Sequence, residues 1–169
     1  MDGGRPDRTS IEVAAARLGD LLRRRGWRLA SAESCTGGLI AAACTALAGS
    51  SDWFERGFVT YSNAAKAESL GVPAALINAH GAVSEEVACA MAAGALAHSA
   101  AQLAVAVTGI AGPGGAVSGK PVGTVWLALA ASGEAPWAER LQLGGDRAAV
   151  RAQTVDIALQ RLAERAARG

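Results

Sequence analysis

The fold of this chain is constrained most strongly by one sequence feature. It is a short apolar strand followed by a turn of small residues and an apolar helix. Residues 28–32 read as a buried strand, residues 33–38 (Glu-Ser-Cys-Thr-Gly-Gly) as a turn and residues 39–47 as a helix. A second apolar run, residues 103–107 (Leu-Ala-Val-Ala-Val), is typical of a strand covered on both faces, and it also ends in a glycine-rich loop. Such units indicate an α/β fold whose ligands bind beyond the carboxyl ends of the strands.

The remaining pattern completes this architecture. We expect a first helix to begin at the capping box of Thr9 and Glu12 and to stop at Gly26, and a last helix to follow Asp146. The other elements are helices at 64–70, 74–79 and 84–98 and strands at 53–61, 122–130 and 137–143. The chain is 51% hydrophobic, enough for a proper core. The prediction is one α/β domain over residues 1–169, a three-layer α/β/α sandwich with a mixed, mainly parallel sheet. Residues 1–8 are expected to be a disordered tail.

Composition excludes several classes of function. A net charge of +1, from 16 basic and 15 acidic residues, provides no basic surface for nucleic acid or anionic lipid. No segment is typical of a signal peptide or of a membrane helix, so we expect a cytoplasmic protein without a membrane partner. The three cysteines and two histidines lack metal-ligand spacing, and no metal and no cofactor are predicted.

Ser34 is the candidate nucleophile, because it stands at the tip of the first turn. The first N–H groups of the following helix are expected to be unpaired and to point outward, as hydrogen-bond donors for an oxyanion. The alternative is an ordinary helix cap, since serine and threonine begin many helices. The loop at Thr108 should lie at the same edge of the sheet, and the segment after Tyr61 could join the two.

Lys66 is the candidate base. Only Lys66 and Lys120 among the 16 basic residues are lysines, and a buried lysine can lose its proton whereas arginine in effect cannot. Tyr61 is the single tyrosine and could relay a proton, orient the lysine or simply pack at a strand end. No histidine has a context that favours a Ser-His triad.

Two other patterns are set aside. The spacing Gly114-x-x-x-x-Gly119-Lys120 is that of a phosphate-binding P-loop, but Pro121 replaces the required hydroxyl residue. Cys35 is the rival nucleophile, yet it has no evident histidine partner and is interpreted as a small buried thiol.

Several long strings resemble the CinA C-terminal domain family of nicotinamide-nucleotide amidohydrolases, also called nicotinamide mononucleotide (NMN) deamidases. They are A-E-S-C-T-G-G at 32–38, A-G-S-S-x-W-F-E-R-G-F-V-T-Y-S-N-x-A-K at 48–66, H-G-A-V-S-E at 80–85, G-I-A-G-P at 109–113 and K-P-V-G-T-V-W at 120–126. The resemblance implies hydrolysis of the small molecule NMN to nicotinate mononucleotide and ammonia, in NAD recycling, by a homo-oligomer.

The resemblance also implies roles for individual residues. Ser34 would be the nucleophile and Lys66 the general base, with Tyr61 assisting, and Arg147 would bind the phosphate or support the site. The expected mechanism is acyl transfer through a Ser34 ester. The sites expected to hold the oxyanion are Thr36, Gly37 and Gly38, and those expected to approach the ribose phosphate are Thr108, Gly109 and Gly112. A non-catalytic module that binds or senses pyridine nucleotides and an amidase for another small amide stay open.

Overall fold

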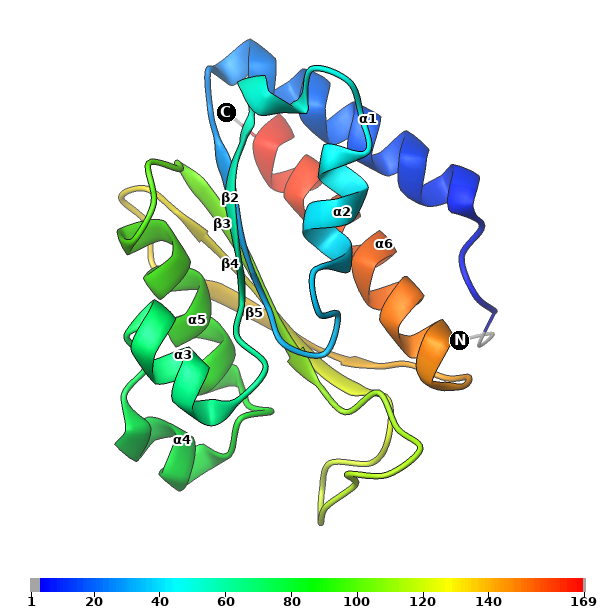
Figure 1. The fold of residues 1–169 in the computed structure, drawn as a ribbon, viewed down its shortest axis with the longest axis vertical. Coiled ribbons are helices and arrows are strands. Elements are labelled where there is room, and N and C mark those ends of the chain that lie inside the picture. Colours follow the sequence, from blue (N-terminus) through cyan, green and yellow to red (C-terminus); the bar gives the residue numbers. More distant parts are fainter. Residues whose placement is uncertain (1–3, 169) are drawn as a thin grey trace.

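A five-stranded mixed sheet organises the computed structural model, which describes residues 4–168 (Figure 1). The strand order is β2-β1-β3-β4-β5. β1 pairs in parallel with β2 and with β3, whereas β4 pairs antiparallel with β3 and with β5. Within the described residues, β4 therefore runs against the other four strands. The strands are β1 (Leu29–Glu33), β2 (Phe54–Val59), β3 (Leu103–Gly109), β4 (Thr124–Ala131) and β5 (Trp137–Gln142).

Helices cover both faces of the sheet (Figure 1). One layer holds α1 (Arg8–Arg25), α2 (Leu39–Thr45) and α6 (Arg147–Ala167), and the other holds α3 (Asn63–Leu70), α4 (Ala74–His80) and α5 (Glu85–Ala97). A short 3-10 helix, Ser50–Asp52, precedes β2. The predicted three-layer α/β/α sandwich is thus confirmed.

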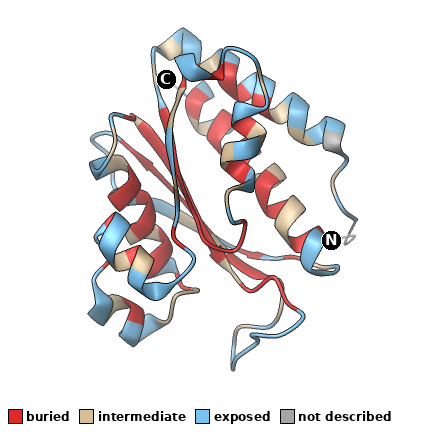
Figure 2. Ribbon diagram, viewed as in Figure 1, coloured by how far each residue is buried: buried red, intermediate tan, exposed pale blue. Residues whose placement is uncertain are grey.

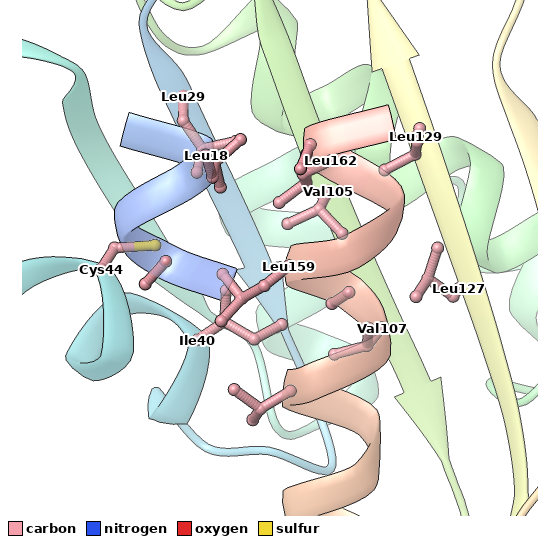
Figure 3. Packing of buried hydrophobic residues seen from close by; sticks show 14 of the residues in the cluster. Leu18, Leu29, Ile40, Cys44, Val105, Val107, Leu127, Leu129, Leu159 and Leu162 are labelled. Carbon is pink, nitrogen blue, oxygen red and sulfur yellow. The ribbon is translucent and has the colours of Figure 1, made fainter. Parts of the chain in front are cut away.

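The core has two halves because neighbouring side chains of a strand point to opposite faces. On the α1/α6 side, leucine and valine side chains of α1 and α6, with Ile40 and Cys44 of α2, gather over β1, β3 and β4 (Figure 3). On the α5 side the same strands contribute mainly alanines, which lets α5 approach closely. Gly94 of α5 packs so tightly on α3 that a Cβ there would overlap the carbonyl oxygen of Leu70. The central strands are buried along most of their length (Figure 2).

Helix ends differ from prediction mainly at α1. The helix begins at Arg8, and the side chain of Asp7 accepts a hydrogen bond from the Thr9 N–H, so the predicted capping box at Thr9 is wrong. Of the predicted tail, residues 1–3 lie outside the described residues and residues 4–7 have no regular secondary structure. Asp146 caps α6 as predicted, by accepting from the Ala149 N–H. Within residues 4–168, no helix is both long and apolar enough to cross a bilayer.

Candidate active site

Ser34 follows β1 directly, at the carboxyl end of the parallel part of the sheet. Its backbone N–H donates to the carbonyl of Val107 at 3.0 Å, which ties the residue to the neighbouring strand β3. The residue is 8% exposed. A rigid strand end therefore positions the hydroxyl, and a small opening to solvent remains.

Lys66 reaches Ser34 from α3. The hydroxyl of Ser62 caps α3 by accepting from the Ala65 N–H, which sets the start of the helix so that Lys66 faces the sheet. The Nζ of Lys66 lies 3.0 Å from Ser34 Oγ, 2.9 Å from the carbonyl oxygen of Thr60 and 3.3 Å from that of Tyr61. The predicted contact between the two side chains is present.

The surroundings of Lys66 favour its neutral form. The residue is 1% exposed, and burial lowers the pKa of its amine from the ordinary 10.5. Among the described residues no carboxylate pairs with it, and its partners are two carbonyls and a hydroxyl. A neutral amine donates two N–H groups and carries one lone pair. If the neutral amine gives its two N–H groups to the Thr60 and Tyr61 carbonyls, its lone pair is left to accept from the Ser34 hydroxyl, as a general base requires.

Cys35 lies beside Ser34 but in a different environment. Burial raises the pKa of its thiol to about 11, so the thiol is protonated near neutral pH. Because the thiolate is the nucleophilic form, Cys35 is poorly suited to attack a substrate. This agrees with its interpretation as a buried thiol.

The prediction of outward-pointing N–H groups at the start of α2 is wrong. The carboxylate of Glu33, fully buried at the end of β1, accepts from the Thr36 hydroxyl at 2.6 Å, from Ile40 N–H at 2.8 Å and from Ala41 N–H at 3.1 Å. These donors are used inside the protein. Glu33 was missed as a functional residue, although a carboxylate just before a helix start is a recognisable signal.

Other N–H donors remain in the turn itself. The N–H groups of Thr36 and Gly38 have no acceptor among the described residues, whereas that of Gly37 donates to the Ser34 carbonyl at 3.1 Å. Gly37 and Gly38 have φ of 57° and 108°, which side chains rarely adopt. The N–H groups of Thr36 and Gly38 are thus available to donate to an oxyanion. Gly37 contributes to the shape of the turn through its backbone conformation.

Tyr61 contacts the site in two separate ways. Its carbonyl accepts from Lys66, and its hydroxyl accepts from Arg147 Nη2 at 3.1 Å. Arg147 also donates through Nη1 to the carbonyl of Gly112 at 2.9 Å. Tyr61 is 61% exposed, so its ring does not fill the core. The backbone of Tyr61 orients the lysine, and a catalytic role for its hydroxyl stays a prediction.

The loop after β3 is shaped by packing. Thr108 is buried and its hydroxyl donates to the Ala82 carbonyl at 2.9 Å. A Cβ on Gly109 would lie 2.6 Å from Val125 Cγ2, and one on Gly112 would lie 2.5 Å from Val122 Cγ1. These contacts explain the two glycines without a ligand. Their approach to a ribose phosphate stays a prediction.

A cleft of about 660 Å³ opens at the start of α6. It is lined by Ala111, Pro113, Val122, Gly145, Asp146, Arg147, Ala148 and Arg151. Arg151 was also missed, although it lies one helical turn after Arg147 and so on the same face of the helix. Among residues 4–168, no three His, Cys, Asp or Glu side chains converge as metal ligands.

Comparison with known proteins decides the family. The model of the CinA C-terminal domain matches residues 11–166. The chain belongs to the CinA C-terminal domain family. It is similar to the nicotinamide-nucleotide amidohydrolase PncC of Pseudomonas putida, with 56% identity over 152 residues that cover 90% of this chain and 94% of the relative.

Other family members show the range of lengths and the fold. A CinA-like protein of Citrifermentans bemidjiense is 57% identical over 143 residues, which are 85% of this chain and 34% of that longer protein. The crystal structure of the competence/damage inducible protein CihA from Agrobacterium tumefaciens superposes with a TM-score of 0.89 at 47% identity, over 93% of this chain and 94% of that one. The fold of the CinA family member is therefore shared by a solved structure.

Proposed function

We propose that this protein hydrolyses the carboxamide of NMN to nicotinate mononucleotide and ammonia, as part of NAD recycling. The observation that carries the proposal is the 3.0 Å contact between Lys66 Nζ and Ser34 Oγ. A buried amine that pairs with no carboxylate of residues 4–168, next to a hydroxyl at a strand end, is the arrangement of an activated serine. The name of the Pseudomonas putida relative, which matches over 94% of its length, supports the same reaction.

Acylation begins with the neutral amine of Lys66. It takes the proton of the Ser34 hydroxyl as Oγ attacks the carboxamide carbon, and the carbonyl oxygen becomes an oxyanion. The N–H groups of Thr36 and Gly38 stabilise that charge. The protonated Lys66 then gives its proton to the departing nitrogen, which leaves as ammonia while Ser34 holds the acyl group.

Deacylation uses the same groups in reverse. Lys66 is neutral again and removes a proton from water, whose oxygen attacks the ester carbon. The second tetrahedral intermediate collapses with loss of Ser34 Oγ, which regains its proton from Lys66. The products are the nicotinate nucleotide and the restored enzyme.

Arg147 provides the phosphate contact in this proposal. It is exposed at the edge of the cleft, and its guanidinium is held by the Gly112 carbonyl and the Tyr61 hydroxyl. A guanidinium fixed in this way can present further N–H groups to a phosphate. The cleft would then receive the nucleotide part of the substrate while the carboxamide reaches Ser34.

The test is ammonia release from NMN by wild type, Ser34→Ala and Lys66→Met, with and without EDTA. We expect turnover by wild type alone, unaffected by the chelator. Loss of wild-type activity in EDTA would overturn the metal-free mechanism. Tight binding of NMN without turnover would favour the nucleotide-binding module, and turnover of another small amide but not NMN would favour the second alternative.

Two structural expectations belong to the same proposal. The chain acts as one domain over residues 1–169, and it assembles as a homo-oligomer. Light scattering coupled to size-exclusion chromatography measures the second directly, and a monomeric mass at working concentration would contradict it.

A further inference from the structure

We propose that Arg151 is a positioning residue that aims the Thr36 N–H at the substrate carbonyl. The inference rests on the proposed function, because it concerns the oxyanion of the same reaction. Arg151 donates through Nε to the Cys35 carbonyl at 3.1 Å and through Nη2 to the Thr36 carbonyl at 3.3 Å. Arg151 lies 116 positions after Cys35 and 115 after Thr36. These two hydrogen bonds therefore connect α6 to the turn that carries the nucleophile.

Because the peptide bond is planar, holding the Cys35 carbonyl also fixes the direction of the Thr36 N–H. The carbonyl of Cys35 and the N–H of Thr36 belong to one peptide unit, and in a trans unit they point in opposite directions. Because Arg151 holds the carbonyl toward α6, the N–H points away from α6. The helix that carries Lys66, α3, lies on the other face of the sheet (Figure 1). The free N–H of Thr36 is therefore directed to the side from which Lys66 reaches Ser34.

Among residues 4–168, no other side chain hydrogen-bonds to this peptide unit. Glu33 binds the Thr36 hydroxyl and the N–H groups of Ile40 and Ala41, all outside the Cys35–Thr36 peptide. The Gly37 N–H donates to the Ser34 carbonyl at 3.1 Å and closes the turn around this peptide, but neither atom belongs to the peptide itself. Among the described residues, Arg151 is thus the side chain that restrains the orientation of the oxyanion donor.

A phosphate contact is the competing role, since Arg151 also lines the cleft. The two roles differ in kinetics. A positioning residue acts in the transition state, so its loss lowers kcat and leaves KM nearly unchanged. A phosphate ligand acts on binding, so its loss raises KM for NMN and has no effect on the riboside, which lacks the phosphate.

The experiment compares Arg151→Met with Arg161→Met. Arg161 is on the same helix and donates two hydrogen bonds to Glu139, so its loss is a matched removal of a guanidinium away from the site. We expect Arg151→Met to lower kcat about 100-fold, the usual cost of a lost oxyanion donor, with KM unchanged. Arg161→Met should keep the wild-type kcat. Unchanged kcat in Arg151→Met, or a rise in KM alone, would overturn the inference.

Two further measurements guard against misfolding and against failure of the proposed function. Arg151→Lys keeps the charge but cannot donate both hydrogen bonds in the geometry of the guanidinium. This variant should fold and show a kcat between those of wild type and Arg151→Met. A wild-type kcat in Arg151→Lys would count against the inference. If wild type does not hydrolyse NMN, the rate at which a fluorophosphonate labels Ser34 replaces kcat, because its phosphoryl oxygen needs the same donor. Slower labelling of Arg151→Met than of Arg161→Met supports the inference. Equal rates, or no labelling of wild type, refute it.

Discussion

The side-chain nitrogen of Lys66 lies 3.0 Å from the hydroxyl oxygen of Ser34, although 32 positions separate the two residues. The backbone carbonyls of Thr60 and Tyr61 complete the surroundings of that nitrogen. Carbonyls accept hydrogen bonds from a neutral amine as well as from a charged one, but they do not neutralise a positive charge. Among residues 4–168, the lysine is therefore held in place without a carboxylate that would keep it protonated.

Lys66→Arg should abolish turnover although it preserves positive charge. Arginine stays protonated and cannot accept the serine proton, and a general base contributes roughly 100- to 10,000-fold to rate. Ammonia release from NMN measures the effect. The control is Lys120→Arg, at the other lysine, whose Nζ donates to the His80 carbonyl. Activity in Lys66→Arg close to that of Lys120→Arg would contradict the role of the amine.

Cys35→Ala should retain most of the activity. The pKa of the thiol, about 11, leaves little thiolate near neutral pH, and its side chain is buried. Steady-state kinetics of Cys35→Ala and Ser34→Ala decide between the two nucleophiles. An inactive Cys35→Ala together with an active, folded Ser34→Ala would reverse the assignment.

Glu33→Gln should destabilise the protein and reduce its activity. One oxygen of the carboxylate accepts from Thr36 and Ile40 and the other from Ala41, so an amide in its place leaves at least the partly buried Ala41 N–H facing an NH₂ group. The expected loss in the free energy of unfolding is about 1–3 kcal/mol. Urea unfolding measures it, and Glu164→Gln, at an exposed ion pair with Arg161, is the control with an expected change below about 1 kcal/mol. Equal stability of the two variants would show that Glu33 does not clamp the turn.

Arg147→Met should raise KM for NMN about tenfold or more, because a charge-assisted contact to phosphate is lost. Nicotinamide riboside lacks the phosphate, so its kcat/KM should be the same for the variant and for wild type. Comparison of the two substrates separates phosphate binding from support of the site. An equal loss on both would assign Arg147 to the support of Tyr61 and the Gly112 loop instead.

The sequence predicted best those strands whose residues are buried along their whole length. β1 and β3 are covered on both faces and therefore appear as continuous apolar runs, and Ser62 and Asp146 begin helices with recognisable caps. The nearness of Ser34 and Lys66 followed from the rule that loops meet at the carboxyl ends of parallel strands.

Other features depend on where a side chain turns in three dimensions. The Glu33 carboxylate accepts hydrogen bonds from the first N–H groups of α2, such as that of Ile40. Arg151 contacts the turn at Cys35, which lies 116 positions earlier in the chain. Thr108 and Gly109 were interpreted as ligand contacts because a glycine-rich loop resembles a binding loop. The packing of that loop on Ala82 and β4 becomes visible only when the sheet is assembled.

The pH dependence follows from the lowered pKa of Lys66. The neutral amine is the active form, so kcat/KM should rise with pH through that pKa, which lies below the ordinary 10.5. Between the folded and the unfolded pKa the unfolded chain binds more protons, so Lys66 also makes stability rise with pH in that window.

Nuclear magnetic resonance of protein labelled with ¹³C at the lysine ε-carbon tests the central claim most directly. The chain has two lysines, Lys66 and Lys120, so the spectrum should contain two signals, and Lys120→Arg assigns them. We predict that the Lys66 signal titrates below 10.5, at the pH where kcat/KM rises. Titration of Lys66 at or above its ordinary pKa would show a charged amine beside Ser34 and would contradict the account.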